Sequence, residues 1–153
     1  IGYSGLNVHR ADRCAEAIAR GYTLATYVSS RATIWPDLRI GHNCLIMEGC
    51  VIQPFVTIGD GAIICCNSVI SHHSRIGEHC FISAQATVAG GVTIGANCFI
   101  GVGATIRNDL TVGSNCIVGA GTLILADAVD GSAYMQTGTP VSGIPSRRLR
   151  SLL

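Results

Sequence analysis

Large aliphatic residues recur every six positions through most of the chain. From Val28 to Ile124, each of the 17 positions spaced six residues apart is Ile or Val, without one insertion. A second series, mostly of small residues, follows four positions after the first: Ala32, Leu38, Cys44, Cys50, Val56, Ala62, Ser68, Ser74, Cys80, Ala86, Val92, Cys98, Ala104, Leu110, Cys116 and Thr122. A large aliphatic residue with a small partner in every hexad is typical of a parallel β-helix, in which each hexad supplies one short strand and one corner.

A second period of 18 residues lies on top of the hexads. The pair Ile-Gly or Val-Gly recurs with its glycine at Gly41, Gly59, Gly77, Gly95 and Gly113. Three hexads therefore make one coil with a triangular cross-section, and we expect these glycines to adopt the backbone conformations of tight corners. Residues 18 apart should stack on neighbouring coils about 4.8 Å apart, as adjacent strands do.

The two ends of the chain differ from this repeat. One helical face is predicted from Val8, Ala11, Ala15 and Ile18, with Asn7 as a possible cap and Gly21 where the helix stops. A strand over residues 23–28 follows. We therefore expect a partial N-terminal α/β segment over 1–27, the β-helix over 28–127 and a C-terminal tail over 128–153 with turns and a basic end.

Composition excludes several classes of partner. Charged residues make up 12% of the chain and the net charge is +1, which gives no electrostatic basis for binding nucleic acid or an anionic membrane. The longest apolar stretch, Cys116 to Val129, is interrupted by glycines and Asp127 and is too short to span a bilayer. The sequence contains no basic region followed by an apolar run, so we expect no signal peptide. We expect no nucleic-acid partner and no membrane insertion.

Five of the eight cysteines occupy the small position of the repeat: Cys44, Cys50, Cys80, Cys98 and Cys116. A free cysteine behaves as a small buried hydrophobic residue, so these five are expected to be core residues. Cys14, Cys65 and Cys66 lie outside the series, and there is no C-x-x-C pair. We therefore expect reduced thiols and a protein located in the cytoplasm. A thiol nucleophile at Cys65 or Cys66 remains a weaker alternative.

Two adjacent histidines are the strongest candidates for chemistry. His72 and His73 follow Ile70 at a corner and should face outward, and the residue 18 positions after His72 is Gly90. An imidazole can accept a proton near neutral pH, while a bare glycine N–H one coil above can stabilise an oxyanion. His73 either orients and tunes His72 or is a plain surface residue. His42 and His79 fall on a different edge and are expected to be ordinary surface residues.

These motifs resemble the hexapeptide-repeat acyltransferases. Within that family they are similar to the sugar acetyltransferases, a group that includes sialic acid O-acetyltransferases and nucleotide-amino-sugar N-acetyltransferases. The resemblance covers about residues 28–147, and its motifs are Ile70–Ile82, Ala89–Gly95, Gly101–Ile106, Val118–Ile124 and Gly143–Arg147.

The resemblance implies a left-handed helix and a homotrimer, with acetyl-CoA in the groove between adjacent subunits. It also implies roles for individual residues: His72 as catalytic base, His73 beside it, Gly90 as the amide that meets the acetyl carbonyl, Gly101 and Gly119 as further cofactor contacts, and Gly2 and Tyr3 in the loop that binds the nucleotide sugar. Residues 1–27 would then be the last part of a nucleotide-sugar-binding domain. Many relatives have glutamate where this chain has His73, and some have a histidine at the position of Phe81.

The sequence therefore predicts direct transfer of an acetyl group from acetyl-CoA to an amine or hydroxyl of a sugar, with a nucleotide sugar as the expected form. Two alternatives remain. One is a non-catalytic trimeric scaffold, and the other is a metalloenzyme similar to the γ-class carbonic anhydrases, which share this fold. The paired zinc histidines of that class, five residues apart, are missing here, because Gly77 and Glu78 stand at those positions. No metal is expected. The acceptor sugar, the choice of nitrogen or oxygen and the acyl chain stay open.

Overall fold

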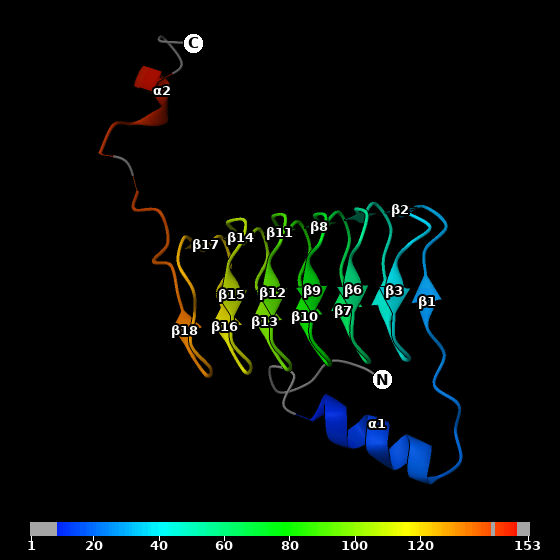
Figure 1. Ribbon diagram of the computed structural model, residues 1–153. Coiled ribbons are helices and arrows are strands. Elements are labelled where there is room, and N and C mark those ends of the chain that lie inside the picture. Colours follow the sequence, from blue (N-terminus) through cyan, green and yellow to red (C-terminus); the bar gives the residue numbers. More distant parts are fainter. Residues whose placement is uncertain (1–8, 142, 150–153) are drawn as a thin grey trace.

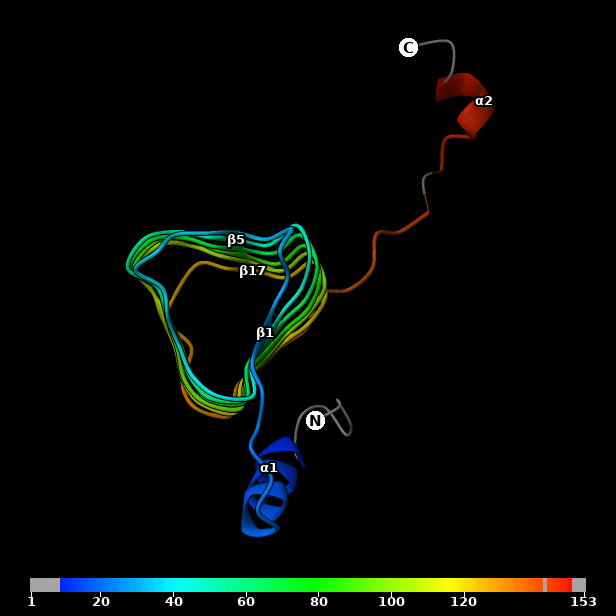
Figure 2. The same ribbon diagram turned by 90° about the vertical axis from the view of Figure 1, so that its right-hand side faces the viewer.

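The computed structural model describes residues 9–141 and 143–149, and its body is a left-handed parallel β-helix (Figure 1). Sheet A contains β1 (Tyr27–Val28), β4 (Leu45–Ile46), β7 (Ile63–Ile64), β10 (Phe81–Ile82), β13 (Phe99–Ile100), β16 (Ile117–Val118) and β18 (Ala133–Tyr134). Sheet B contains β2 (Thr33–Ile34), β5 (Val51–Ile52), β8 (Val69–Ile70), β11 (Thr87–Val88), β14 (Thr105–Ile106) and β17 (Leu123–Ile124). Sheet C contains β3 (Arg39–Ile40), β6 (Thr57–Ile58), β9 (Arg75–Ile76), β12 (Thr93–Ile94) and β15 (Thr111–Val112). Viewed along the axis, the three sheets form the sides of a triangle (Figure 2).

The 18-residue register predicted from the sequence is confirmed. Phe81 pairs with Phe99 in sheet A, Thr87 with Thr105 in sheet B, and Thr93 with Thr111 in sheet C. From Cys44 to Ile124 the aliphatic residues and their apolar partners form one continuous buried core, whereas Val28 at the start of the series is 38% exposed. The five cysteines of the repeat are 0–2% exposed, and all eight cysteines have free thiols.

The glycines of the Ile-Gly repeat are needed for a different reason from the predicted corner conformation. From Ile40 to Val118, the left-handed backbone conformation falls on the third residue after each aliphatic, for example on Asn43, Asn67 and His73. The Ile-Gly glycines are not among the residues with positive φ. They are needed because the coils approach closely: a Cβ on Gly77 would lie 2.5 Å from the carbonyl carbon of Gly95.

Helix α1 (Arg10–Ala19) lies beside the edge where sheet C turns into sheet A (Figure 2). Its buried residues are Arg10 and Cys14, while Ile18 of the predicted apolar face is 61% exposed. The Arg10 guanidinium donates hydrogen bonds to the backbone carbonyls of Gly61, His79 and Cys80, so this buried cation attaches the helix to the coils. The residue at the N-cap is His9, and the predicted cap Asn7 lies outside the described residues.

The hexad pattern fades after Ile124 because the last coil is shorter. Ile117 pairs with Ala133, which is a spacing of 16 residues in place of 18. Beyond β18 the chain leaves the coils, and residues 146–149 form the short helix α2 (Ser146–Leu149), which lies away from the body (Figure 1). Neither of the two described helices is long and apolar enough to cross a membrane.

Candidate active site

The corner between β8 and β9 presents His72 and His73 at the edge between sheets B and C, which we call the B/C edge. Both side chains are exposed, as predicted. Their backbones are held by the coil before them: the N–H of His72 donates to Gln53 Oε1 at 3.0 Å, and that of His73 donates to the Pro54 carbonyl at 3.1 Å. The corner itself is therefore fixed, although its side chains face solvent.

The stacking of His72 and Gly90 follows the predicted register. A Cβ added to Gly90 would lie 2.5 Å from Cε1 and 2.7 Å from Nε2 of His72, so the imidazole lies against a bare glycine backbone. The Gly91 N–H donates to the His72 carbonyl at 2.9 Å and holds the two coils in this position. Within the described part of the chain, no acceptor binds the Gly90 N–H. A proton acceptor and an available amide donor thus lie side by side.

His73 is in direct contact with His72. The two Nδ1 atoms are 3.1 Å apart, and the His73 ring also packs on Phe55 with a centroid distance of 4.8 Å. His73 has a φ of 61°, in the left-handed region that Asn, Asp and His adopt more often than other non-glycine residues. A hollow of about 410 Å³ adjoins this corner and is lined by Asp37, Arg39, Phe55, Val56, Thr57, His73 and Arg75.

The contact between the two rings decides which nitrogen of His72 can act as a base. One proton can lie between two facing Nδ1 atoms, and a neutral imidazole has one N–H and one free lone pair. When Nδ1 of His72 bears the hydrogen and donates it to His73, the Nε2 of His72 is left as a proton acceptor. That nitrogen is the one beside Gly90.

The structure does not bring Gly101 and Gly119 to the same edge as His72. Both lie at corners between sheets A and B, the A/B edge, at the other end of sheet B. Close packing alone explains Gly101, because a Cβ there would lie 2.5 Å from the Ala120 nitrogen. Gly2 and Tyr3 lie outside the described residues.

Cys65 and Cys66 also lie on the A/B edge and are half-buried. Burial raises the pKa of the Cys65 thiol above its ordinary value. Burial also raises the pKa of the Cys66 thiol, and a hydrogen bond from its Sγ to Glu48 Oε1 at 3.4 Å acts in the same direction. Protonated thiols are poor nucleophiles, so this environment does not favour an acyl-enzyme at either residue.

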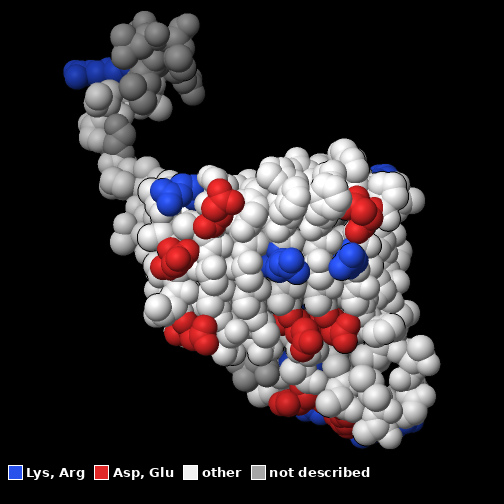
Figure 3. Space-filling model, viewed as in Figure 1, with Lys and Arg blue, Asp and Glu red and all other residues white. Residues whose placement is uncertain are grey.

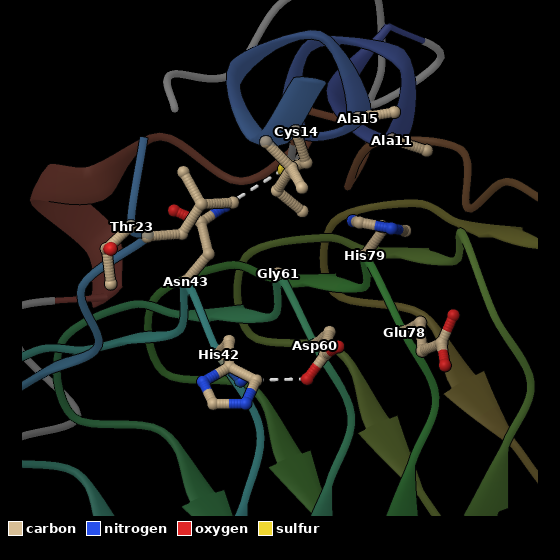
Figure 4. A pocket seen from close by; sticks show the side chains of 12 residues that line it. Ala11, Cys14, Ala15, Thr23, His42, Asn43, Asp60, Gly61, Glu78 and His79 are labelled. Atoms are coloured by element: carbon tan, nitrogen blue, oxygen red, sulfur yellow. Dashed lines mark hydrogen bonds between the residues drawn. The ribbon is translucent and has the colours of Figure 1, made fainter. Parts of the chain in front are cut away.

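A second hollow, of about 360 Å³, lies between α1 and the edge between sheets C and A, the C/A edge (Figure 4). His42, Asp60 and His79 border it. The backbone N–H of His42 donates a hydrogen bond to Asp60 Oδ1 at 2.8 Å. His79 is half-buried there, which differs from the expected surface position. The sequence did not reveal this hollow, because the helical pattern of residues 10–19 does not say which edge the helix covers.

Charged side chains are few and scattered on the face that Figure 3 shows. Among the described residues, no group of three or more His, Cys, Asp or Glu side chains is arranged to hold a metal ion.

Comparison with known proteins identifies the family. The model of the bacterial transferase hexapeptide family (six repeats) matches residues 37–72, 73–108 and 91–126. The acetyltransferase domain of PglB from Neisseria gonorrhoeae, also solved with acetyl coenzyme A, is 32% identical with a TM-score of 0.82. PerB from Caulobacter crescentus, solved with CoA and GDP-perosamine, is 33% identical with a TM-score of 0.83. Both comparisons cover 85% of this chain and 63% of the other, so the chain spans less than two thirds of either relative. No curated protein matched the sequence.

The chain therefore belongs to the bacterial hexapeptide-repeat transferases, and its similar structures include sugar acetyltransferases that were crystallised with CoA or acetyl-CoA.

Proposed function

We propose that this protein transfers an acetyl group from acetyl-CoA to the amine or hydroxyl of a nucleotide-activated sugar. The observation that best supports this function is the contact of the His72 imidazole with the Gly90 backbone on an exposed edge. This arrangement supplies a base and an oxyanion donor at one point, which are the two groups that acyl transfer from a thioester requires.

In the proposed reaction, Nε2 of His72 accepts the proton of the sugar amine or hydroxyl as that group attacks the thioester carbonyl. A bond forms between the acceptor atom and the acyl carbon, and the negative charge on the carbonyl oxygen is stabilised by the Gly90 N–H. The tetrahedral intermediate collapses with loss of the C–S bond. The proton held by His72 then passes to the departing CoA sulfur. His73 accepts the Nδ1–H of His72 and keeps the ring in the required tautomer.

An amine is the favoured acceptor. PerB is described as a perosamine N-acetyltransferase and was solved with GDP-perosamine, a nucleotide amino sugar. We propose that the segment over residues 1–27 helps to bind the nucleotide sugar, with Gly2 and Tyr3 in the binding loop. The free thiols throughout the chain favour a reducing compartment, so we propose that the protein acts in the cytoplasm.

A homotrimer would complete the site. His72 lies on a convex edge, and small-molecule sites are concave, so a second wall has to come from another subunit. His72 and Gly90 lie at one end of sheet B, while Gly101 and Gly119 lie at the other. If the B/C edge of one subunit meets the A/B edge of the next, all four residues border one groove, and three sheets B surround the threefold axis. The outward residues of the two-residue strands of sheet B fit this position because none of them is charged: Thr33, Val51, Val69, Thr87, Thr105 and Leu123.

Turnover by the full-length protein tests this function. Acetyl-CoA is incubated with a panel of nucleotide amino sugars and nucleotide neutral sugars, and the products are identified by mass spectrometry. We expect the mass of a nucleotide amino sugar to increase by that of one acetyl group. A protein that neither binds acetyl-CoA nor acetylates any member of the panel would instead be a scaffold of the same fold.

A further inference from the structure

One buried hydroxyl interrupts an apolar row inside the β-helix. The inward residues beneath the B/C edge are Leu38, Val56, Ser74, Val92, Leu110 and Ala128. Ser74 is the polar member of this row and is 0% exposed. A hydroxyl in such a place costs free energy unless it is hydrogen-bonded. Ser74 belongs to the same coil as His72, and its Oγ donates to the Ala89 carbonyl at 2.9 Å.

The Ala89 carbonyl and the Gly90 N–H belong to the same peptide group. Because a peptide group is planar, a hydrogen bond that fixes the direction of the carbonyl also fixes the direction of the N–H. A donor at the carbonyl oxygen further polarises the amide, and such chains of hydrogen bonds strengthen one another. Ser74 thus acts from inside the core on the amide that lies beside His72 at the surface.

We propose that Ser74 is a positioning residue, which orients and polarises the Gly90 N–H as the oxyanion donor for acyl transfer. This inference rests on the function proposed above and adds a residue that never touches the substrate. At the equivalent positions of the coils directly before and after, Val56 and Val92 have no donor to offer.

The same kind of bond occurs elsewhere in the core and supplies controls. Ser68 Oγ donates to the Ser83 carbonyl at 2.9 Å, with the same 15-residue spacing and the same complete burial, but beneath the A/B edge. Cys80 and Cys98 show that a thiol can replace the hydroxyl, because each donates to the carbonyl 15 residues later at 3.0 Å. Ser68→Ala is therefore the matched control, and Ser74→Cys is the conservative replacement.

Kinetics of the full-length protein provide the first test. We expect Ser74→Ala to lower kcat about tenfold, a part of the roughly 10²–10³-fold that a complete oxyanion donor contributes. KM for acetyl-CoA and for the sugar should stay near the wild-type values. Ser74→Cys should recover most of kcat, and Ser68→Ala should keep it. Equal kcat values for Ser74→Ala and Ser68→Ala would overturn the inference.

Nuclear magnetic resonance provides a second test that does not require activity. The sequence contains two Ala-Gly pairs, Ala89-Gly90 and Ala120-Gly121. Labelling alanine carbonyls with ¹³C and glycine nitrogens with ¹⁵N gives one HNCO peak for each pair. Ser74→Ala should move the Gly90 peak and leave the Gly121 peak in place, whereas an unmoved Gly90 peak would overturn the inference. If the wild-type protein transferred no acyl group, the proposed function would fail, and this spectrum would still show whether Ser74 fixes the Gly90 peptide.

Discussion

The Nδ1 atoms of His72 and His73 lie 3.1 Å apart, so the two rings share one hydrogen. His72 can serve as a base through Nε2 when its own Nδ1 bears that hydrogen and His73 accepts it. When Nδ1 of His73 bears the hydrogen instead, Nδ1 of His72 accepts it and His72 carries its own hydrogen on Nε2. In that arrangement the nitrogen beside Gly90 is not a base.

This relationship predicts that the loss of His73 weakens His72 as a base. We expect His73→Asn to lower kcat/KM by about tenfold, because the Nδ1–H of His72 loses its imidazole acceptor. Asparagine is the suitable replacement because it adopts the left-handed conformation of this corner at Asn43, Asn67, Asn97 and Asn115. An unchanged kcat/KM of the variant in steady-state kinetics would show that His73 does not act on His72.

The buried cysteines should affect stability and not chemistry. Cys98 is 0% exposed, and its Sγ donates to the Gly113 carbonyl at 3.0 Å. We expect Cys98→Ala to lower the free energy of unfolding by about 1–2 kcal/mol, through the lost contacts and the lost hydrogen bond. Alanine is tolerated in this row at Ala62. Chemical denaturation measures the loss, and kcat should remain at the wild-type value. A large fall in kcat with unchanged stability would contradict the core role.

Cys65 and Cys66 should react slowly with alkylating reagents near pH 7. Burial raises the pKa of both thiols, so the reactive thiolate is scarce at neutral pH and increases about tenfold for each pH unit up to that raised pKa. The rate of alkylation by iodoacetamide, followed by peptide mass spectrometry, should rise accordingly.

The double variant Cys65→Ser/Cys66→Ser should retain turnover, since direct transfer needs no thiol. An acetyl group trapped on Cys65 or Cys66 of the wild-type protein would show that transfer proceeds through an acyl-enzyme.

The repeating part of the fold could be predicted almost completely from the sequence. Each hexad makes its own strand and corner, so the positions of His72 and Gly90 on one edge follow from counting 18 residues. The role of the Ile-Gly glycines was predicted for the wrong reason, since a repeat shows where glycine recurs but not how closely the next coil approaches. The close contact of Gly77 with Gly95 is a property of stacked coils.

The non-repeating parts were less accessible. The sequence indicated a helix near its N-terminus, but it did not show that Arg10 would be buried against the carbonyls of His79 and Cys80. It placed His73 beside His72 but not in the left-handed conformation that turns the two Nδ1 atoms toward each other. Such contacts depend on side-chain directions, which a periodic pattern does not encode.

The proposed trimer can be tested with two threonines of one coil. Thr87 faces outward on sheet B and Thr93 faces outward on sheet C. We expect Thr87→Arg to place three positive charges around the threefold axis and to dissociate the trimer, because like charges in a confined interface repel strongly. Thr93→Arg, six residues away and exposed, should leave the assembly intact.

Light scattering measures the difference directly. The wild-type chain of 15.9 kDa should give a particle of about 48 kDa, three times that mass. A wild-type protein that is monomeric at micromolar concentration would contradict both the assembly and the shared groove. Dissociation by Thr93→Arg and not by Thr87→Arg would show that a different face lies at the axis.

The base itself is tested by His72→Ala. We expect kcat to fall by roughly 10²–10⁴-fold, the usual contribution of a general base, with acetyl-CoA binding and the oligomeric state unchanged. The fold should tolerate this substitution because the His72 side chain is exposed at a corner and has no part in the core. His42→Ala is the matched control, since His42 is an exposed corner residue on the C/A edge. It should keep kcat near the wild-type value. If the protein needed His42 and tolerated the loss of His72, the active edge would be C/A, and the role of Gly90 as oxyanion donor would have to be abandoned with that of His72.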